Sequence, residues 1–277
     1  MHRKTPLVAC VLAGMLGVSA ASWPEIRTRA LSSGPSIRGT LTAAFADRQW
    51  PKPKPGSWQP PARSPDGLPP VIKRINTRDK VVFLTLDDGW ETDQRLVDIV
   101  RRQRVPFMTF LTEQAATGRF QYFWALKNAG SPMENHTISH PNMATLSPAE
   151  QRRQICRSAD TINRQLGRRP QLLRPPFGSY NRLTRQAARD CGMKALLIWS
   201  AEFYNGTHSP GGVHNQFVRT DGGTGFRPGD IVLMHFRKGV GRDFATLLGW
   251  IRQQGFRPAP LQDYLPVSLG GTAPDTI

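Results

Sequence analysis

Residues Val81-Val82-Phe83-Leu84-Thr85-Leu86-Asp87-Asp88-Gly89 form an apolar run that ends abruptly at two adjacent carboxylates and a glycine. A run this short and this rich in Val and Phe is typical of a strand buried on both faces, as in a parallel sheet or barrel. Ligands of such sheets bind beyond the carboxyl ends of the strands, where Asp87 and Asp88 lie. The simplest interpretation of the pair is a solvated turn in which an Asp caps the next helix. The alternative is a cation site, because a cation would relieve the repulsion between the two charges.

After Val71 the sequence alternates between short apolar runs and amphipathic segments. Repeated strand-helix-strand units predict a parallel sheet or barrel with right-handed crossovers. We expect Thr92 to cap the first helix, and the Ser147-Pro148-Ala149-Glu150 capping box to open a later one. A long Gly-rich loop is expected after Trp199. Further strands are expected at 107–111, 195–199 and 231–234, an edge or irregular strand at 256–260, and helices at 120–129, 147–166, 183–190 and 243–254.

The chain has 277 residues and a formal net charge of +17, with the basic residues spread along the sequence. This pattern indicates a basic surface that associates with anionic polymers, including acidic wall polymers. No basic region interleaved with stacking aromatic residues is visible, and we therefore expect no nucleic-acid partner. The sequence says nothing about oligomeric state.

The first residues have the order of a secretory signal peptide: Met1-His2-Arg3-Lys4 is basic, and the segment from Leu7 to Ala21 is apolar and rich in small residues. We expect a signal peptide over 1–21, with an uncleaved anchor as the alternative. A Pro-rich linker over 22–70, a catalytic domain over 71–268 and a tail over 269–277 complete the expected organisation. The protein is expected to be secreted or wall-associated, or membrane-anchored if the segment is retained.

Two cysteines, Cys156 and Cys191, follow the expected signal peptide. An even pair in an oxidising compartment indicates one disulfide, with two buried free thiols as the alternative. A bridge between them would be a structural staple rather than a reactive centre.

Several residues could perform chemistry at the strand ends. His136 and His140 are four apart, and with one Asp they would form a three-ligand site with an open position, which suits Zn²⁺ or a similar divalent ion. The Arg174-Pro175-Pro176-Phe177-Gly178 loop leaves the N–H of Phe177 or Gly178 able to face a ligand. His235 ends a further apolar run, 231–234.

Four motifs together resemble those of the polysaccharide deacetylases, the NodB-homology group of family 4 carbohydrate esterases. They are Thr85-Leu86-Asp87-Asp88-Gly89, His136-Thr137-Ile138-Ser139-His140-Pro141, Arg174-Pro175-Pro176-Phe177-Gly178 and Leu233-Met234-His235, in the family's order. The resemblance covers about 71–266. It implies an α/β fold, a distorted (β/α) barrel with about seven parallel strands, and metal-dependent removal of acetyl groups from N-acetylated sugars.

The resemblance also implies a role for each matching residue. Asp87 would be the general base, with Arg174 to orient it, and His235 the general acid. The Phe177 N–H would hold the oxyanion together with the metal, and Leu233 would line the acetyl pocket. The metal ligands would be Asp88, His136 and His140, with Zn²⁺ as the expected ion and Co²⁺ as the alternative.

The chain departs from the family pattern after Trp199. The family usually has an Asp-Trp pair that tunes the acid histidine and covers the acetyl methyl, and Asn205-Gly206 stand at that place here. Asn can orient an imidazole but cannot stabilise its cation by charge, and losses of this kind typically cost about 10–100-fold. Glu202, His208 or His214 could take over this role, and the sequence leaves the choice open.

These features predict an exported, metal-dependent hydrolase of a linear amide bond. A metal-activated water would attack the acetamide of N-acetylglucosamine-containing polysaccharide, with cell-wall peptidoglycan ahead of chitin-like oligosaccharides or acetylated xylan. The alternative is a carbohydrate- or wall-binding module on the same fold that lacks a competent acid.

Overall fold

The computed structural model describes residues 52–59, 61, 64–204 and 216–265. All of them belong to one compact unit, which spans Asp47–Ile277. The expected signal peptide, the tail over 269–277 and most of the expected linker lie outside the described residues. Among the residues described, no helix combines the length and the apolar character that crossing a membrane requires.

A ten-stranded sheet forms the framework, and its strand order is β10-β9-β11-β4-β5-β6-β7-β8-β2, with β12 also paired to β4. Every neighbouring pair is parallel except β9 and β10. The strands are β2 (Val71–Ile72), β4 (Val81–Asp88), β5 (Met108–Leu111), β6 (Met133–Asn135), β7 (Leu172–Leu173), β8 (Ala195–Leu197), β9 (Ala201–Tyr204), β10 (Gln216–Arg219), β11 (Asp230–His235) and β12 (Arg257–Pro258).

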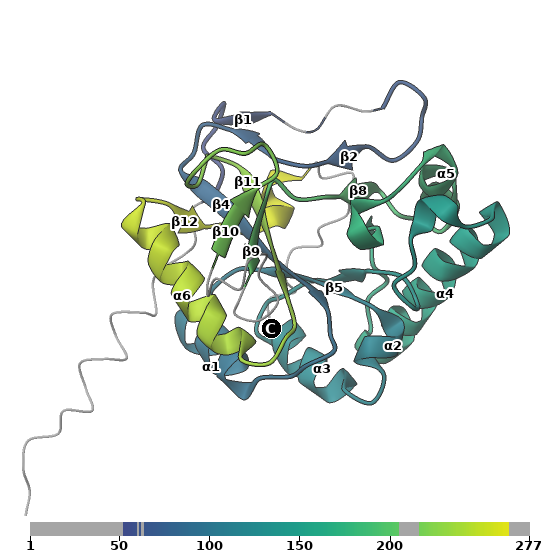
Figure 1. Cartoon of the computed structure of the whole chain (residues 1–277), viewed down its shortest axis with the longest axis horizontal. Coiled ribbons are helices and arrows are strands. Elements are labelled where there is room, and N and C mark those ends of the chain that lie inside the picture. Colours follow the sequence, from purple (N-terminus) through teal and green to yellow (C-terminus); the bar gives the residue numbers. More distant parts are fainter. Residues whose placement is uncertain (1–51, 60, 62–63, 205–215, 266–277) are drawn as a thin grey trace, which may run out of the picture. The chain divides into compact units, whose positions relative to one another are not determined.

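Helices connect the parallel strands and cover the outside of the sheet (Figure 1). They are α1 (Gln94–Gln103), α2 (Glu113–Ala116), α3 (Phe120–Asn128), α4 (Pro148–Leu166), α5 (Arg182–Asp190) and α6 (Val240–Gln253), with 3₁₀ turns at Met143–Thr145, Pro176–Gly178 and Leu261–Tyr264. Helices α1 and α6 pack together on one flank, and α4 and α5 on the other. The curled, mostly parallel sheet confirms the predicted distorted (β/α) barrel. Nine of its ten described strands have a parallel neighbour, among them the two-residue strands β2, β7 and β12, compared with the prediction of about seven.

Strand β4 is the centre of the sheet, and all eight of its residues are buried. Its side chains alternate between two apolar clusters, because successive side chains in a strand point to opposite faces. Val82, Leu84 and Leu86 pack in the cluster that includes α1, α3 and α6. Val81 and Phe83 pack on the opposite side, in the cluster that includes Tyr264. Burial on both faces explains why this strand has no polar residue before its carboxyl end except Thr85.

Local signals in the sequence account for most helix boundaries, with one correction. Ser147 accepts a hydrogen bond from Glu150 N–H (3.3 Å) and Pro148 occupies the first turn of α4, as expected. The first helix is capped by Asp93, whose carboxylate accepts from Arg95 N–H (2.9 Å), and Thr92 is therefore not the cap. The same Asp93 carboxylate accepts from Gly241 N–H (2.9 Å), a contact with α6 that the local sequence could not reveal.

Part of the segment expected to be a spacer packs against the domain. Strand β1 (Trp58–Gln59) pairs with β3 (Asn76–Thr77) in a small antiparallel sheet. The Trp58 ring meets the Tyr264 ring edge-on at 5.9 Å between centroids. Asp66 forms an ion pair with Arg185 of α5 (2.8 Å). The folded unit therefore begins before Val71.

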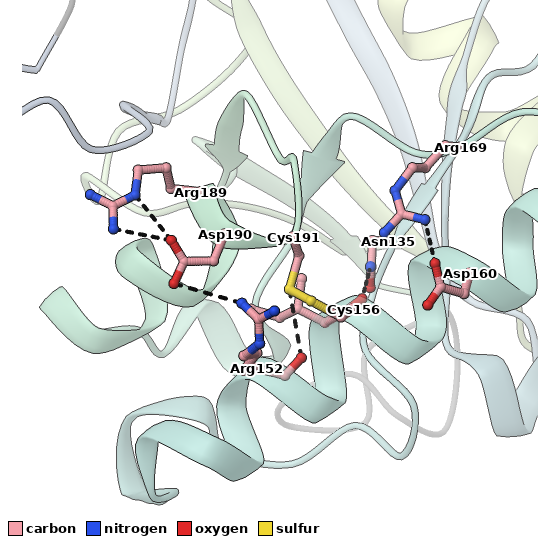
Figure 2. Close-up of a disulfide and its surroundings, with 9 residues drawn as sticks. Asn135, Arg152, Cys156, Asp160, Arg169, Arg189, Asp190 and Cys191 are labelled. Carbon is pink, nitrogen blue, oxygen red and sulfur yellow. Dashed lines mark hydrogen bonds and ion pairs between the residues drawn. A yellow bond between two sulfur atoms is a disulfide. The ribbon is translucent and has the colours of Figure 1, made fainter.

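Cys156 of α4 and Cys191 at the end of α5 form a disulfide (Figure 2). Next to the bridge, Asp190 of α5 forms ion pairs with Arg189 (3.0 Å) and with Arg152 of α4 (3.8 Å). Cys191 is buried and inaccessible to solvent. The bridge fastens two outer helices to each other, which suits the staple role expected from the sequence.

Candidate metal and active site

The carboxyl ends of β4 and β11 lie side by side and supply three polar side chains. The parallel register pairs His235 with Asp87, so both residues occupy the same level of the sheet. Asp88, the last residue of β4, has a φ of 80°, and Gly89 has a φ of 109°. A Cβ on Gly89 would lie 2.9 Å from the Phe123 ring, so a side chain at this sharp turn would be both strained and crowded.

Asp88, His136 and His140 offer ligand atoms that all lie within 4.8 Å of one another. The Asp88 Oδ1 atom lies 3.6 Å from His136 Nε2 and 3.5 Å from His140 Nε2. These separations are too long for hydrogen bonds but close to those of ligands on one ion, because atoms bound tetrahedrally at about 2.0–2.1 Å lie about 3.3 Å apart. Asp88 Oδ1 is also buried, and no residue in the described part of the chain forms a hydrogen bond with it. An orphaned carboxylate oxygen facing two imidazole nitrogens fits a divalent cation.

His136 is held in the form that a metal requires. Its Nδ1 atom lies 2.6 Å from the backbone oxygen of Arg174, so Nδ1 carries the proton and Nε2 keeps its lone pair toward Asp88. Burial lowers the pKa of His136 to about 3. The imidazole is therefore neutral near pH 7, as a ligand must be.

Arg174, directly after β7, is fully buried beneath the site. Its guanidinium donates to Asp87 Oδ1 (2.7 Å), to Thr85 Oγ1 (2.8 Å) and to the backbone oxygen of Leu197 (3.1 Å), and it lies over the Phe110 ring. Burial raises the pKa of Asp87 to about 6, and the charge and hydrogen bond of Arg174 oppose that rise. The other Asp87 oxygen, Oδ2, lies 3.7 Å from His136 Nε2, so it faces the ligand cluster.

The loop after Arg174 places Phe177 at the mouth of the site. Phe177 has a φ of 60°, and its ring meets the His140 ring at 4.6 Å between centroids. Of the two N–H groups that the sequence offered, Gly178 N–H donates to the oxygen of Pro175 (3.0 Å) within the loop. Phe177 N–H thus remains the candidate to face a ligand.

These residues surround one cavity of about 330 Å³. Leu233 lines it, as the sequence indicated, and so do three residues with no role in the primary prediction: Trp199, Glu202 and Arg237. Arg237 lies 3.2 Å from Asp88 Oδ2, and its place two residues after His235 at a strand end was the available signal. The described residues that line it are Asp87, Asp88, His136, His140, Phe177, Trp199, Glu202, Leu233, His235 and Arg237.

The residues expected to act near the acid histidine fall into two groups, those that the structure leaves undescribed and Glu202, whose placement differs from the expectation. Asn205, Gly206, His208 and His214 lie outside the described residues. Glu202 was grouped with the expected loop, yet it belongs to strand β9, which pairs with β11. Its carboxylate lies 3.7 Å from Nδ1 of His235.

Backbone strain is concentrated at this site. Among the described residues, five non-glycine residues have positive φ, and Asp88, Thr137, His140 and Phe177 are four of them. Each such conformation costs free energy and persists only where the surroundings enforce it, which is common at functional sites. Thr137 and His140 are held by the Asn135 side chain, which accepts from Thr137 N–H (2.8 Å), and by the Thr137 hydroxyl, which accepts from His140 N–H (3.2 Å).

Comparison with known proteins agrees with this geometry. The family model described as polysaccharide deacetylase matches residues 74–196. An uncharacterized protein of Streptomyces coelicolor is 35% identical over 202 residues, which cover 72% of this chain and 78% of that protein. A peptidoglycan-N-acetylglucosamine deacetylase of Bacillus cereus is 34% identical over 99 residues, which cover 35% of this chain and 36% of that enzyme.

The solved structures extend the agreement to the fold. The crystal structure of a CE4 family pseudoenzyme from Bacillus anthracis superposes with a TM-score of 0.58 at 23% identity, over 72% of this chain and 70% of that one. The curled parallel sheet, the ligand cluster at its carboxyl edge and the sequence matches agree. The chain therefore belongs to the polysaccharide deacetylase family, the CE4 carbohydrate esterases.

Proposed function

We propose that this protein is an exported, metal-dependent deacetylase that removes N-acetyl groups from N-acetylglucosamine-containing polysaccharide, with cell-wall peptidoglycan as the substrate. The observation that carries the proposal is the arrangement in one cavity of a three-ligand cluster, a carboxylate base and a histidine acid. Asp88, His136 and His140 would hold the metal, and Zn²⁺ suits their donor set, with Co²⁺ as the alternative. A bound ion of this kind lowers the pKa of its water to about 7 and polarises an amide carbonyl.

The side chains divide the proton transfers between them. Asp87 accepts the proton of the attacking water, because its Oδ2 faces the ligand cluster while Oδ1 is held by Arg174. His235, one strand away at the same level, donates a proton to the departing amine. Each transfer contributes about 10²–10⁴-fold to the rate. No covalent intermediate is required.

Phe177, Leu233 and Trp199 bind and orient the acetyl group, and Arg174 supports the site from beneath. Phe177 N–H donates to the developing oxyanion, while Leu233 and Trp199 present apolar surface to the acetyl methyl. The buried Arg174 fixes Asp87 and, through its backbone oxygen, His136. One residue thus orients both the base and a metal ligand.

The proposed location and substrate rest on further features of the chain. The basic-apolar-small order of residues 1–21 and the net charge of +17 suit an exported protein that works next to anionic wall polymers. The Bacillus cereus relative is, by its name, a peptidoglycan-N-acetylglucosamine deacetylase.

A carbohydrate-binding module without catalysis is the second candidate. One observation favours it: burial and nearby cations lower the pKa of His235 to about 3, and an acid must be protonated to act. A pseudoenzyme is also found among the solved structures of this fold.

Acetate release separates the two candidates. Purified protein loaded with Zn²⁺ or Co²⁺ is incubated with N-acetylglucosamine oligomers and with peptidoglycan, and the Asp87→Asn variant serves as the comparison. The proposal predicts release by the wild type and loss of release in the variant. No release from either substrate by wild-type protein with metal demonstrably bound would refute the deacetylase assignment.

A further inference from the structure

Glu202 and His235 face each other across two neighbouring strands. Strand β9 pairs with β11 in parallel, and the register places Glu202 opposite Leu233, two residues before His235. The Glu202 Oε1 atom lies 3.7 Å from His235 Nδ1. Among the described residues, this is the ion pair that His235 makes. Catalytic hydrogen bonds are often long in empty sites and shorten when ligand binds.

The Glu202 carboxylate is held in place on its other side. Tyr204, two residues along the same strand, donates its hydroxyl proton to Glu202 Oε2 (2.8 Å). The Glu202 side chain is 12% exposed and that of His235 is 27% exposed, so water screens the pair only in part. This geometry directs Oε1 at Nδ1 and leaves the opposite ring nitrogen, Nε2, available to the cavity.

The charges around the pair explain why His235 needs a carboxylate. Burial, together with the charges of Arg237, His136, Arg174 and His140, lowers the pKa of His235 to about 3. Burial and the charge of Asp87 raise the pKa of Glu202 to about 7, while Tyr204 and Arg174 oppose that rise. Each group is thus unfavourable as an isolated charge, and placing opposite charges next to each other offsets this cost for both.

We propose, on the basis of the proposed function, that Glu202 is the positioning residue of His235: its carboxylate accepts a hydrogen bond from Nδ1–H and keeps Nε2 directed at the leaving amine. Glu202 acts through His235 and does not touch the substrate's reacting atoms. The chain thereby supplies from strand β9 the negative charge that Asn205 cannot provide.

The first test does not depend on activity. The ring nitrogens of His235 are titrated by ¹H–¹⁵N NMR in the wild type and in Glu202→Gln and Glu202→Asp, with His235→Gln used to assign the signal. Removing the carboxylate destabilises the imidazolium, so we expect the His235 midpoint to be about one pH unit or more lower in Glu202→Gln. Glu202→Asp retains the charge on a shorter side chain, so its His235 midpoint should lie between those of the wild type and Glu202→Gln.

Glu113→Gln is the matched control, because Glu113 is a buried carboxylate paired with Arg157 (3.4 Å) and is not part of the cavity lining. The titration midpoint of His235 in Glu113→Gln should equal that in the wild type. Equal midpoints in the wild type and Glu202→Gln would overturn the inference, whether or not the protein is an active enzyme.

The second test uses kinetics. Glu202→Gln should lower kcat by about 10–100-fold with KM and metal content unchanged, and Glu202→Asp should recover part of the loss. Because the acid must be protonated, the alkaline limb of kcat should move to lower pH in Glu202→Gln. Wild-type protein that releases no acetate contradicts the proposed function alone, whereas an active wild type with an equally active Glu202→Gln contradicts the positioning role alone.

Discussion

The sheet holds a buried aspartate, Asp230, at the amino end of strand β11 and the candidate metal site at its carboxyl edge, and these two ends of the sheet differ in how completely their polar groups are satisfied. At the amino end, Asp230 accepts from Ser200 Oγ (2.9 Å), from Arg227 N–H (2.7 Å) and from the buried guanidinium of Arg219. At the carboxyl edge, Asp88 Oδ1 of the neighbouring strand β4 is buried, has no hydrogen-bond partner among the described residues, and faces two imidazoles.

The difference shows that buried charge alone does not mark a functional site. A saturated cluster such as that of Asp230 has no capacity left for a ligand, so its role is to hold the sheet. An orphaned oxygen that lies among strained residues has capacity for one. Changes at the carboxyl edge should therefore affect activity, and changes at the amino end should affect stability.

The largest effect is expected from the base at the carboxyl edge. Asp87→Asn keeps the shape of the side chain but removes the proton acceptor, so kcat for acetate release should fall by about 10²–10⁴-fold. Metal content, measured by atomic emission on the same preparations, should stay at the wild-type level. A variant that retains more than half of the wild-type kcat would exclude Asp87 as the base.

At the amino end the expected effect is on stability. Arg219→Met removes the buried guanidinium and leaves the half-exposed Arg74, 3.8 Å from Asp230 Oδ1, as the remaining described cation beside this buried carboxylate, which should lower the free energy of unfolding by about 3–5 kcal/mol in urea titrations. The folded fraction should keep the wild-type kcat, because Arg219 is not part of the cavity lining. Loss of kcat without loss of stability would contradict the division between the two ends.

The disulfide on the outer flank should also act on stability alone. Cys156→Ser with Cys191→Ser opens a bridge with a sequence separation of 35 residues, and the chain-entropy model gives a loss of about 3–4 kcal/mol. The change should appear as a lower urea midpoint with unaltered metal affinity. Two free thiols titrated in the unfolded, unreduced wild-type protein would show that the bridge does not form.

The smallest effect concerns pH. Asp87 must be ionised to accept a proton. The value of kcat/KM should therefore rise as the pH rises through the pKa of Asp87, and fall below that pKa. That pKa is raised to about 6 by burial, and a bound cation favours the ionised form, so the acid limb of the profile should lie at or below about pH 6. If kcat/KM instead falls with a midpoint above pH 7, the group that limits the rate in acid is not Asp87.

The sequence predicted the fold and the ligand cluster because both depend on local patterns. The buried β4 ends at its carboxylates, and parallel strands bring all carboxyl ends to one edge, so Asp87, Asp88, His136, Arg174 and His235 had to meet there. Strand β9 escaped prediction because its Ala-Glu-Phe-Tyr segment is short and gains its partners, β10 and β11, only from distant parts of the chain.

The same limit explains the other differences. The cap of α1 is Asp93 rather than Thr92 because Asp93 also binds Gly241 N–H of α6, a contact 148 residues away. The position of Arg237, two residues after His235 at a strand end, was a signal in the sequence, but its contact with Asp88 depends on how β11 pairs with β4. The features that local sequence patterns did not predict are therefore those that depend on contacts between residues far apart in the sequence.

The claim that the unsatisfied carboxyl edge is a metal site can be tested by one measurement, the binding of Zn²⁺ to metal-free protein by isothermal titration calorimetry. The wild type and Asp230→Asn, each assayed as folded protein, should bind one ion per chain at this site, whereas Asp88→Asn should bind it at least about 10-fold more weakly. Equal affinity of Asp88→Asn and the wild type would contradict the account.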